Sequence, residues 1–444
     1  MNRVLTSLFA LLIGLGAFAQ VPSYSLLEAQ TYAIDNAYSV RTNALEYERA
    51  KKILMENIAL GLPQIFASAD WTKNISLQAF VVDQGQGPQA LTFGTPYVGN
   101  ATISGEQLIF DGSYIVAVLA SQVVKDNALN DLEKSEIEIR EQVANAYHLV
   151  LVSEKTVEII KENLIFITKN YDESRKMFEA GFMEETDADQ LELIKSNLEN
   201  QLDYAEKQAN IARMLLKFYM GMDVTSEIVL NDDIEKLMVF SEDGESLLNT
   251  QFDLENHIDY RTILTQERGQ NLNLKNENMA FVPKVKFKYL YGHNVFSSSA
   301  FLFEGTSEVD YAQNIQQNFG LNISVPILTG GSRIARVQQA KIQLQQVEIA
   351  KKQISDNLKL QYQTAKAEYS FALNSYHTQM RNVQIAKKIR DTGSKKFSEG
   401  LMSSLDFTQA ENQYQDALRE AINAANNVLD KKVKLEKIIG KYNN

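Results

Sequence analysis

Few side chains in this 444-residue sequence combine the type and the spacing that chemistry needs. There are no cysteines, which removes thiolate catalysis, disulfide frameworks and Cys-zinc sites. The four histidines lie far apart, without the short spacings of metal sites. They are His148, His257, His293 and His377. The segment Gly85–Gly87 precedes a proline and no helix, so it is not a dinucleotide fingerprint. We therefore predict no catalytic residues, no metal site, no cofactor and no enzymatic activity.

Carboxylates recur in a motif that the chain contains twice. A phenylalanine three residues before a glycine is followed by an aspartate and then by Gln-x-Glu. The first copy is Phe178–Gly181, Asp187 and Gln190–Glu192, and the second is Phe397–Gly400, Asp406 and Gln409–Glu411. Every pair is offset by 219 residues. Aspartate after a turn is also typical of a helix N-terminus, so a capping role for each aspartate is the alternative to a functional one.

The repeat extends beyond this motif. Gly221 and Gly440 share the offset of 219, and Ile109–Gly112 pairs with Ile327–Gly330 at 218. Such a period is too long for a solenoid and indicates a duplicated structural half. Each half is predicted to contain a helix, two strands, a very long helix and a returning helix. The first helices are expected at 25–60 and 257–280.

The strand pairs show period-two alternation. In the segment 284–291, Val285 and Phe287 share one face, whereas Lys284, Lys286 and Lys288 share the other. Segments 65–71, 100–106 and 318–325 alternate similarly, and the polar stretches 83–94 and 294–313 between strands are expected to be surface loops. A soluble sheet with one buried face shows the same alternation as a membrane barrel. Strands of about 9–11 residues favour the barrel, with the lysines facing its lumen.

Four strands cannot close such a barrel, because the smallest common outer-membrane barrels have eight strands. The missing strands must come from other copies of the chain, and three copies give twelve.

After each strand pair the apolar period changes to about 3.5 residues, which is typical of a coiled coil. Residues 112–181 contain no proline and predict a rod about 100 Å long at 1.5 Å per residue. Gly181 and Gly400 are predicted to end the two rods, where the chain turns and returns. His148 and His377 are expected on rod surfaces or facing the lumen. The acidic segment 222–254 is expected to form a collar.

The N-terminus is predicted to be a secretory signal. A short positive region containing Arg3 precedes the apolar stretch Val4–Phe18, and Ala17–Ala19 matches a small-x-small cleavage pattern. The apolar stretch is shorter than the roughly 20 residues of a spanning helix. We expect export. The net charge of −12 argues against general attraction to nucleic acid.

The duplication, the strand pairs and the two tips together resemble the TolC family of outer-membrane efflux proteins. The resemblance covers essentially all of the predicted mature chain. It implies a homotrimer whose chains form one barrel in the outer membrane and a helical barrel in the periplasm. It also implies a tapered periplasmic end that a periplasmic adaptor protein docks onto and opens, with an inner-membrane pump beyond it.

The resemblance also implies site residues. Asp187 and Asp406 would form acidic rings at the pore constriction. Met402 stands where some family members carry arginine. The adaptor-docking residues at the two tips would be Gly181, Phe182, Met183, Gly400, Leu401 and Met402.

The predicted fold class is an α+β membrane protein: a long α-helical coiled-coil barrel plus a 12-stranded transmembrane β-barrel formed by a trimer, with four strands per chain and a two-fold internal repeat. The predicted function is the exit duct of a tripartite efflux pump or type I secretion system. The alternatives are a structural or adhesive trimeric coiled-coil envelope protein and a periplasmic adaptor. Contacts with outer-membrane lipid are expected, and none with nucleic acid.

The predicted segments of the first half are a signal peptide (1–19), a periplasmic helix (20–62), a barrel hairpin (63–111), a helical hairpin (112–221) and a collar (222–256). Those of the second half are a helix (257–282), a barrel hairpin (283–332) and a helical hairpin (333–444).

Overall fold

A computed structural model describes residues 22–233 except 84 and 86, residues 243–300 and residues 311–443. The predicted signal peptide and parts of the collar and of the 294–313 segment lie outside these residues. The chain divides into two compact units. One comprises the residues up to 46 with 129–262 and the residues from 351, and the other comprises 47–128 and 263–350.

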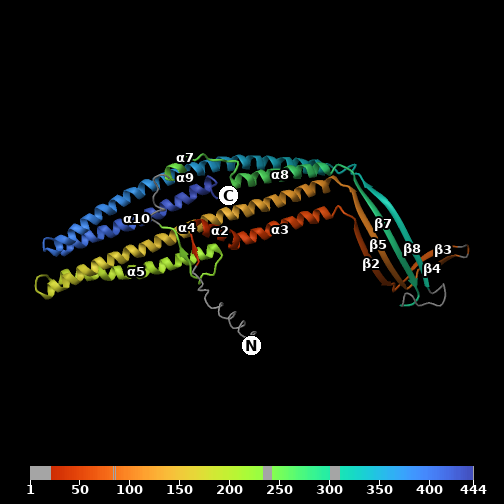
Figure 1. The fold of residues 1–444 in the computed structure, drawn as a ribbon. Helices are drawn as coiled ribbons and strands as arrows, with labels where there is room; N and C mark the ends of the chain where they lie inside the picture. Colours follow the sequence, from red (N-terminus) through yellow and green to blue (C-terminus); the bar gives the residue numbers. More distant parts are fainter. Residues whose placement is uncertain (1–21, 84, 86, 234–242, 301–310, 444) are drawn as a thin grey trace, which may run out of the picture. The chain divides into compact units, whose positions relative to one another are not determined.

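The second of these units is built on a four-stranded antiparallel sheet (Figure 1). Its strands are β2 (Gln64–Lys73), β5 (Tyr97–Phe110), β7 (Lys284–Ser297) and β8 (Tyr311–Ser324), in the order β2-β5-β7-β8. Each half of the chain therefore contributes one strand pair, and the halves meet where β5 pairs with β7. The strands are longer than predicted, because three of the four have 14 residues.

The pairing register gives the sheet two chemically different faces. Odd-numbered residues of neighbouring strands pair with one another and form one face of the sheet, which is largely apolar. Several of its side chains are well exposed: Ile65, Ile103, Phe319, Leu321 and Ile323. The opposite face is largely polar and carries the three predicted lysines. On it the hydroxyls of Ser68 and Thr102 lie 2.7 Å apart across the β2–β5 pair. Phe66, 59% exposed, is an apolar exception on this face.

The expectation of a simple surface loop at 83–94 was wrong. Strand β3 (Gln78–Asp83) and strand β4 (Pro88–Phe93) pair there as a separate antiparallel hairpin between β2 and β5. Gly85 and Gly87 both have positive φ, at 89° and 94°. Glycines and a proline in this segment suggested a loop, but they serve the tight turn of a hairpin.

The predicted rods are present as continuous helices. Helix α4 covers Gly112–Glu179 (68 residues) and α9 covers Ser332–Ser398 (67 residues). Each returns through a second helix, α5 (Glu185–Met220) or α10 (Ser404–Ile438). Helix α8 (Ile258–Met279) lies where the first helix of the second half was predicted. Within the described ranges, no helix combines the length and the apolar run that crossing a bilayer requires.

The first helix of the chain is not continuous from 25 to 60, as predicted, but breaks at Ala37. Helix α2 (Leu26–Asn36) ends there and α3 (Tyr38–Ala59) begins, because Ala37 adopts an extended backbone with ψ of 137°. Gly221, the left-handed cap of α5, packs against the break, and a side chain there would collide with the Asn36 carbonyl. The break is therefore a packing site that the sequence pattern did not reveal.

The main core lies in the first unit, where α2 packs with the middle of α4, α5, α9 and α10. Its fully buried members alternate small and aromatic side chains, as in Ala33, Val143, Tyr147, Tyr369 and Val428. Two short strands, β1 (Ser23–Tyr24) and β6 (Val229–Leu230), pair in parallel beside it, and the Tyr147 hydroxyl donates to the Tyr24 carbonyl at 3.0 Å.

Part of the predicted collar also packs on this core. Helix α7 (Asp243–Asn249) contributes buried Leu247. The rings of Phe252 and Tyr362 stack with centroids 5.3 Å apart, and the Tyr362 hydroxyl donates to the Thr250 carbonyl at 2.7 Å. These contacts fasten the segment after α5 to α9.

Candidate functional site

The two helical hairpins turn over at glycines with the same geometry. Gly181 and Gly400 have φ of 78° and 71°, in the left-handed region that favours glycine. The next residue's amide donates back into the rod, from Phe182 to Met177 at 2.9 Å and from Leu401 to the corresponding carbonyl at 2.7 Å. The repeated glycine is therefore needed to satisfy the last carbonyls of each long helix.

The predicted docking residues fall into two groups. Phe182 and Leu401 project from the tips, with 81% and 73% of their surface exposed. Met183 and Met402 instead pack against a small core that includes Phe397. The Phe397 and Phe407 rings stack in this core with centroids 5.3 Å apart. The two methionines therefore support the turns, and the apolar surface available at the tips is that of Phe182 and Leu401.

The two predicted constriction residues have different environments. Asp406 is exposed, and its amide donates to the Ser403 hydroxyl at 3.1 Å while that hydroxyl lies 2.7 Å from the Asp406 carboxylate. It thus completes the N-terminal cap of α10. Asp187 is half-buried and accepts a hydrogen bond from the hydroxyl of Ser404, which lies on the other tip. The fold therefore joins the two tips through Asp187, and pore lining stays a prediction.

The three predicted lumen lysines form ion pairs on the polar face of the sheet. Lys288 lies 2.8 Å and Lys286 3.6 Å from the carboxylate of Glu106 on the neighbouring strand β5. Lys284 lies 2.9 Å from Asp111. The charges of this face are thus partly neutralised within one chain.

A group that the sequence analysis did not single out lies above the tips. We call Asn163, Arg390, Glu411 and Gln415 the buried polar node, since three helices contribute them and Arg390 and Glu411 are 6% and 0% exposed. Arg390 donates to the Asn163 side-chain oxygen at 3.0 Å. Asn163 and Gln415 donate to one Glu411 oxygen at 2.9 and 2.6 Å.

The Arg390 guanidinium is held between two rings. Its central carbon lies 4.2 Å from the Phe166 centroid and 4.1 Å from the Tyr414 centroid. It also forms an ion pair with Asp391 at 2.7 Å, whereas Glu411 is 4.0 Å away. Burial raises the pKa of Glu411 to about 7, although the positive charge of Arg390 acts in the opposite direction. The raised pKa agrees with the long Glu411 distance, because desolvation outweighs a distant partner.

Sequence reasoning could have found part of this node. Glu411 belongs to the repeated Gln-x-Glu motif, but the motif served only to align the two halves. Arg390 is a single cation in a polar rod, and nothing in its spacing shows that Phe166 of the other half covers it.

The prediction that His148 lies on a rod surface or faces the lumen was wrong. Its side chain is buried, and burial lowers its pKa to about 4 with the charge of Lys432 acting in the same direction. His257 is also buried, and burial lowers its pKa. His377 is exposed, as expected for a rod surface. Among the described residues, no three acidic or histidine side chains are grouped to hold a metal ion.

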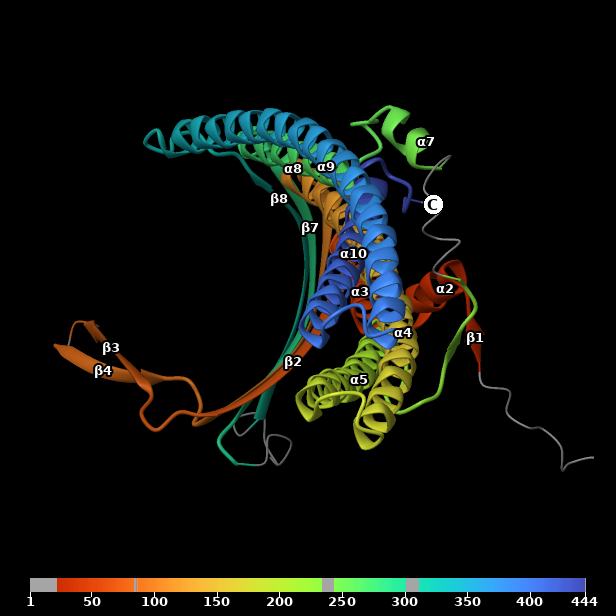
Figure 2. The same ribbon diagram turned by 90° about the vertical axis from the view of Figure 1, so that its left-hand side faces the viewer.

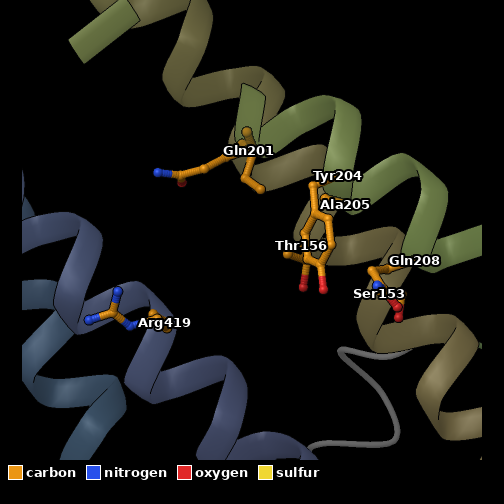
Figure 3. Close-up of a pocket in the computed structure, with 8 residues that line it drawn as sticks. Ser153, Thr156, Gln201, Tyr204, Ala205, Gln208 and Arg419 are labelled. Carbon is orange, nitrogen blue, oxygen red and sulfur yellow. The ribbon is translucent and has the colours of Figure 1, made fainter. Parts of the chain in front are cut away.

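A polar groove of about 460 Å³ lies between the two helical hairpins (Figure 3). Figure 3 shows Ser153 and Thr156 on α4 and Gln201 and Tyr204 on α5, with Arg419 of α10 facing them. Six of its eight lining residues carry a hydroxyl, amide or guanidinium group. None of its lining side chains forms a nucleophile–base pair.

We compared the chain with known protein families and with curated proteins. Residues 270–441 match the family model described as outer membrane efflux protein. No curated protein matches the chain.

Solved structures match nearly the whole chain. CusC, whose crystal structures concern folding and transmembrane channel formation, gives a TM-score of 0.73 at 15% identity, over 93% of this chain and 91% of CusC. The CmeC outer membrane channel of Campylobacter jejuni gives 0.71 at 17% identity, over 94% and 85% of the two chains. The open MtrE outer membrane channel of Neisseria gonorrhoeae gives 0.71 at 18% identity, over 94% and 88%. At these identities the likeness establishes the fold.

Proposed function

We propose that this chain is the outer-membrane exit duct of a tripartite efflux pump or type I secretion system, which its match to the outer membrane efflux protein family over residues 270–441 and its fold support. The resemblance predicted from the sequence is thereby confirmed. The structural or adhesive coiled coil and the periplasmic adaptor are not favoured, because the family match and the fold are those of outer-membrane channels. The duct is a passive conduit, and no residue performs a reaction on the cargo.

The observation that carries the proposal is the two-faced sheet. Its apolar face is exposed at large side chains such as Phe319 (80%) and Ile65 (75%). A water-facing sheet normally exposes its polar face and buries its apolar one. The reverse is suitable where lipid is the solvent and the polar face lines a wet channel.

The two edges of the sheet support an assembly of several copies. Among the described residues, strands β2 and β8 each pair on one side only, so the sheet of one chain has two open edges. Exposed backbone groups at an edge are costly in a bilayer, and closure removes them. Three copies joined β8 to β2 make a twelve-stranded barrel in the outer membrane.

The helical tips form the gate in this proposal. Asp187 and Asp406, three copies of each, provide acidic rings that favour cations and bind multivalent ones. Phe182 and Leu401, exposed at the turns, provide apolar contacts for a periplasmic adaptor. Since Asp187 also holds Ser404 of the other tip, docking that separates the tips breaks this hydrogen bond.

The test is conductance across a planar lipid bilayer, with full-length protein purified in detergent and its oligomer followed on unheated gels. We expect a heat-sensitive trimer that opens small, cation-selective channels. A water-soluble monomer without conductance would overturn the proposal and require the same strands to form a soluble sheet.

A further inference from the structure

The β3–β4 hairpin is an arm that extends beyond the four-stranded sheet. It leaves β2 after Lys73 and returns to β5 at Tyr97, and its base is closed by an amide hydrogen bond from Asn74 to the Pro96 carbonyl at 2.7 Å. The rings of Trp71 and Tyr97 stack at the end of the sheet, with centroids 5.7 Å apart. In Figure 2 the arm lies on the side toward which the sheet curves.

One face of this arm is apolar and uncovered. The register places Phe80 opposite Leu91, with Phe93 two pairs away on the same side. The exposed fractions of Phe80, Leu91 and Phe93 are 55%, 39% and 56%. The Phe80 and Phe93 rings pack edge to face, with their centroids 5.7 Å apart. We call these three residues the arm patch. The opposite face carries Ala79 and Val81, the chain neighbours of Phe80, and Val81 is 71% exposed. The aromatic side chains of the arm are thus all on the first face.

The arm is unsuited to standing alone in water. A two-stranded hairpin is at best marginally stable without a third strand or a packed layer. A contiguous exposed apolar patch normally marks an interaction site. Asp83 is the only charged residue from 74 to 97, so solvation of charges does not offset this exposure.

The composition of the arm indicates which kinds of partner are unsuited to cover the arm patch. A segment resting on a lipid surface is expected to carry Trp or Tyr at the interface and Lys or Arg toward the headgroups. Residues 78–93 contain none of these four types. A charged foreign partner finds only the Asp83 carboxylate there.

The position of the arm favours a second copy of the chain. Strand β3 of the arm follows β2, the open edge where the proposed barrel joins the next copy, and β4 leads back into β5. The arm therefore begins beside that proposed interface. Rotational symmetry then brings identical uncharged patches toward one axis, and identical apolar patches are complementary to each other without any charge repulsion.

We propose that the arm patches of neighbouring copies pack against one another at the outer mouth of the duct and narrow it. This inference rests on the proposed trimeric barrel, since a single chain has no neighbouring arm. It places a second restriction on the pathway, built from Phe80, Leu91 and Phe93 and independent of the acidic residues at the helical tips.

The cysteine-free chain allows a clean cross-linking test. Phe80→Cys places a thiol in the patch, and Ala79→Cys places one on the opposite face of the same strand as a matched control. Both are prepared as full-length trimers in detergent and oxidised or treated with a short bis-maleimide. We expect Phe80→Cys to lose up to two-thirds of its monomer band to a covalent dimer, because only two of three thiols in a trimer can pair. Ala79→Cys is expected to lose little.

The outcomes separate this inference from the proposed function. Absence of both the heat-sensitive trimer and the channels in the unmodified protein would overturn the duct itself. Trimers that conduct, but in which Phe80→Cys cross-links no more than Ala79→Cys, would overturn the arm contact alone and leave lipid or a foreign protein as the cover. A variant with residues 78–93 replaced by two glycines should conduct more than the unmodified trimer, and equal conductance would overturn the narrowing.

Discussion

The two helical hairpins contain the same three kinds of side chain at equivalent positions, but with two of them exchanged. In the first hairpin, Tyr171 on the rod faces Lys195 on the return helix, with the ammonium 5.2 Å from the ring centroid. Glu192 lies 3.4 Å from the Tyr171 hydroxyl. In the second hairpin the positions 219 residues later hold Arg390 on the rod and Tyr414 on the return helix, 4.1 Å apart. Glu411 is the equivalent acid.

The exchange goes with a difference in burial. Glu192 is exposed and the Lys195 side chain is 30% exposed, whereas Arg390 and Glu411 are almost completely buried. With the cation on the rod, Phe166 and Asn163 of the first half can close over it. A planar guanidinium stacks between two rings in a way that an ammonium cannot. The comparison teaches that the duplication kept the residue types. The packing between the two halves decides in which hairpin these side chains are buried and contribute to stability.

The largest difference in the free energy of unfolding is expected between the variants Arg390→Ala and Lys195→Ala. Removing the buried cation takes away the positive charge nearest Glu411 and the donor to the Asn163 side-chain oxygen, while Glu411 keeps its hydrogen bonds from Asn163 and Gln415. Losing one member of a buried pair costs about 3–5 kcal/mol. Losing an exposed pair costs about 1 kcal/mol or less. Thermal unfolding of the purified protein, followed by helical circular dichroism, measures both. Equal losses in the two variants would contradict the comparison.

The pH dependence of stability is the second test. The pKa of Glu411 is raised by burial from 4.5 to about 7 in the folded chain, so the unfolded chain loses this proton first as the pH rises. The stability that the protonated carboxyl contributes is complete below about pH 4.5, falls between pH 4.5 and 7, and is lost above that range. The integrated change is on the order of 3 kcal/mol.

Glu411→Gln should flatten this part of the stability profile, while Glu192→Gln in the other hairpin should leave the profile as in the unmodified protein. Melting temperatures in matched buffers from pH 4 to 8 check this. A profile unaffected by Glu411→Gln would show that another group titrates.

A smaller difference in stability is expected between alanine variants of the two predicted constriction residues, Asp187 and Asp406. Asp187→Ala leaves the buried Ser404 hydroxyl without its acceptor, which costs about 1–3 kcal/mol. Asp406→Ala keeps the backbone bond to Ser403 and costs about 0.5 kcal/mol. Both should weaken block of the channel by multivalent cations, but only Asp187→Ala should also raise the resting conductance. Identical conductance in both variants would remove Asp187 as the link between tips.

The smallest effect on stability is expected at the projecting tip residues. Phe182→Ala and Leu401→Ala should each change the free energy of unfolding by about 0.5 kcal/mol or less, since both side chains are exposed. Met183→Ala, which removes a packed side chain, should cost more. A stable Phe182→Asp variant that still forms channels but no longer supports transport in cells would assign Phe182 to docking. Transport at the unmodified level would contradict that role.

How much the sequence revealed depended on whether a pattern was local. Alternation in Lys284–Tyr291 predicted β7, and the repeated glycines at 181 and 400 predicted both turns, because each signal lies within a few neighbouring residues. The break at Ala37 was missed because Gly221, which packs against it, lies far along the chain. Arg390 and His148 were missed for the same reason, since the side chains that bury them belong to other helices. Met183 and Met402 were grouped with the exposed tip residues because a turn sequence does not show which side chain folds inward.

The pairing of β5 with β7 has a consequence for assembly. The second strand of the first half there meets the first strand of the second half, and a β8–β2 joint between copies would be the same joint by the internal repeat. A trimer of this chain would then be a ring of six similar units with two kinds of seam. Three seams form within one polypeptide at a high effective concentration that dilution cannot change, and three form only when copies meet. Diluting the refolding chain should therefore slow closure of the ring without slowing formation of the four-stranded sheet.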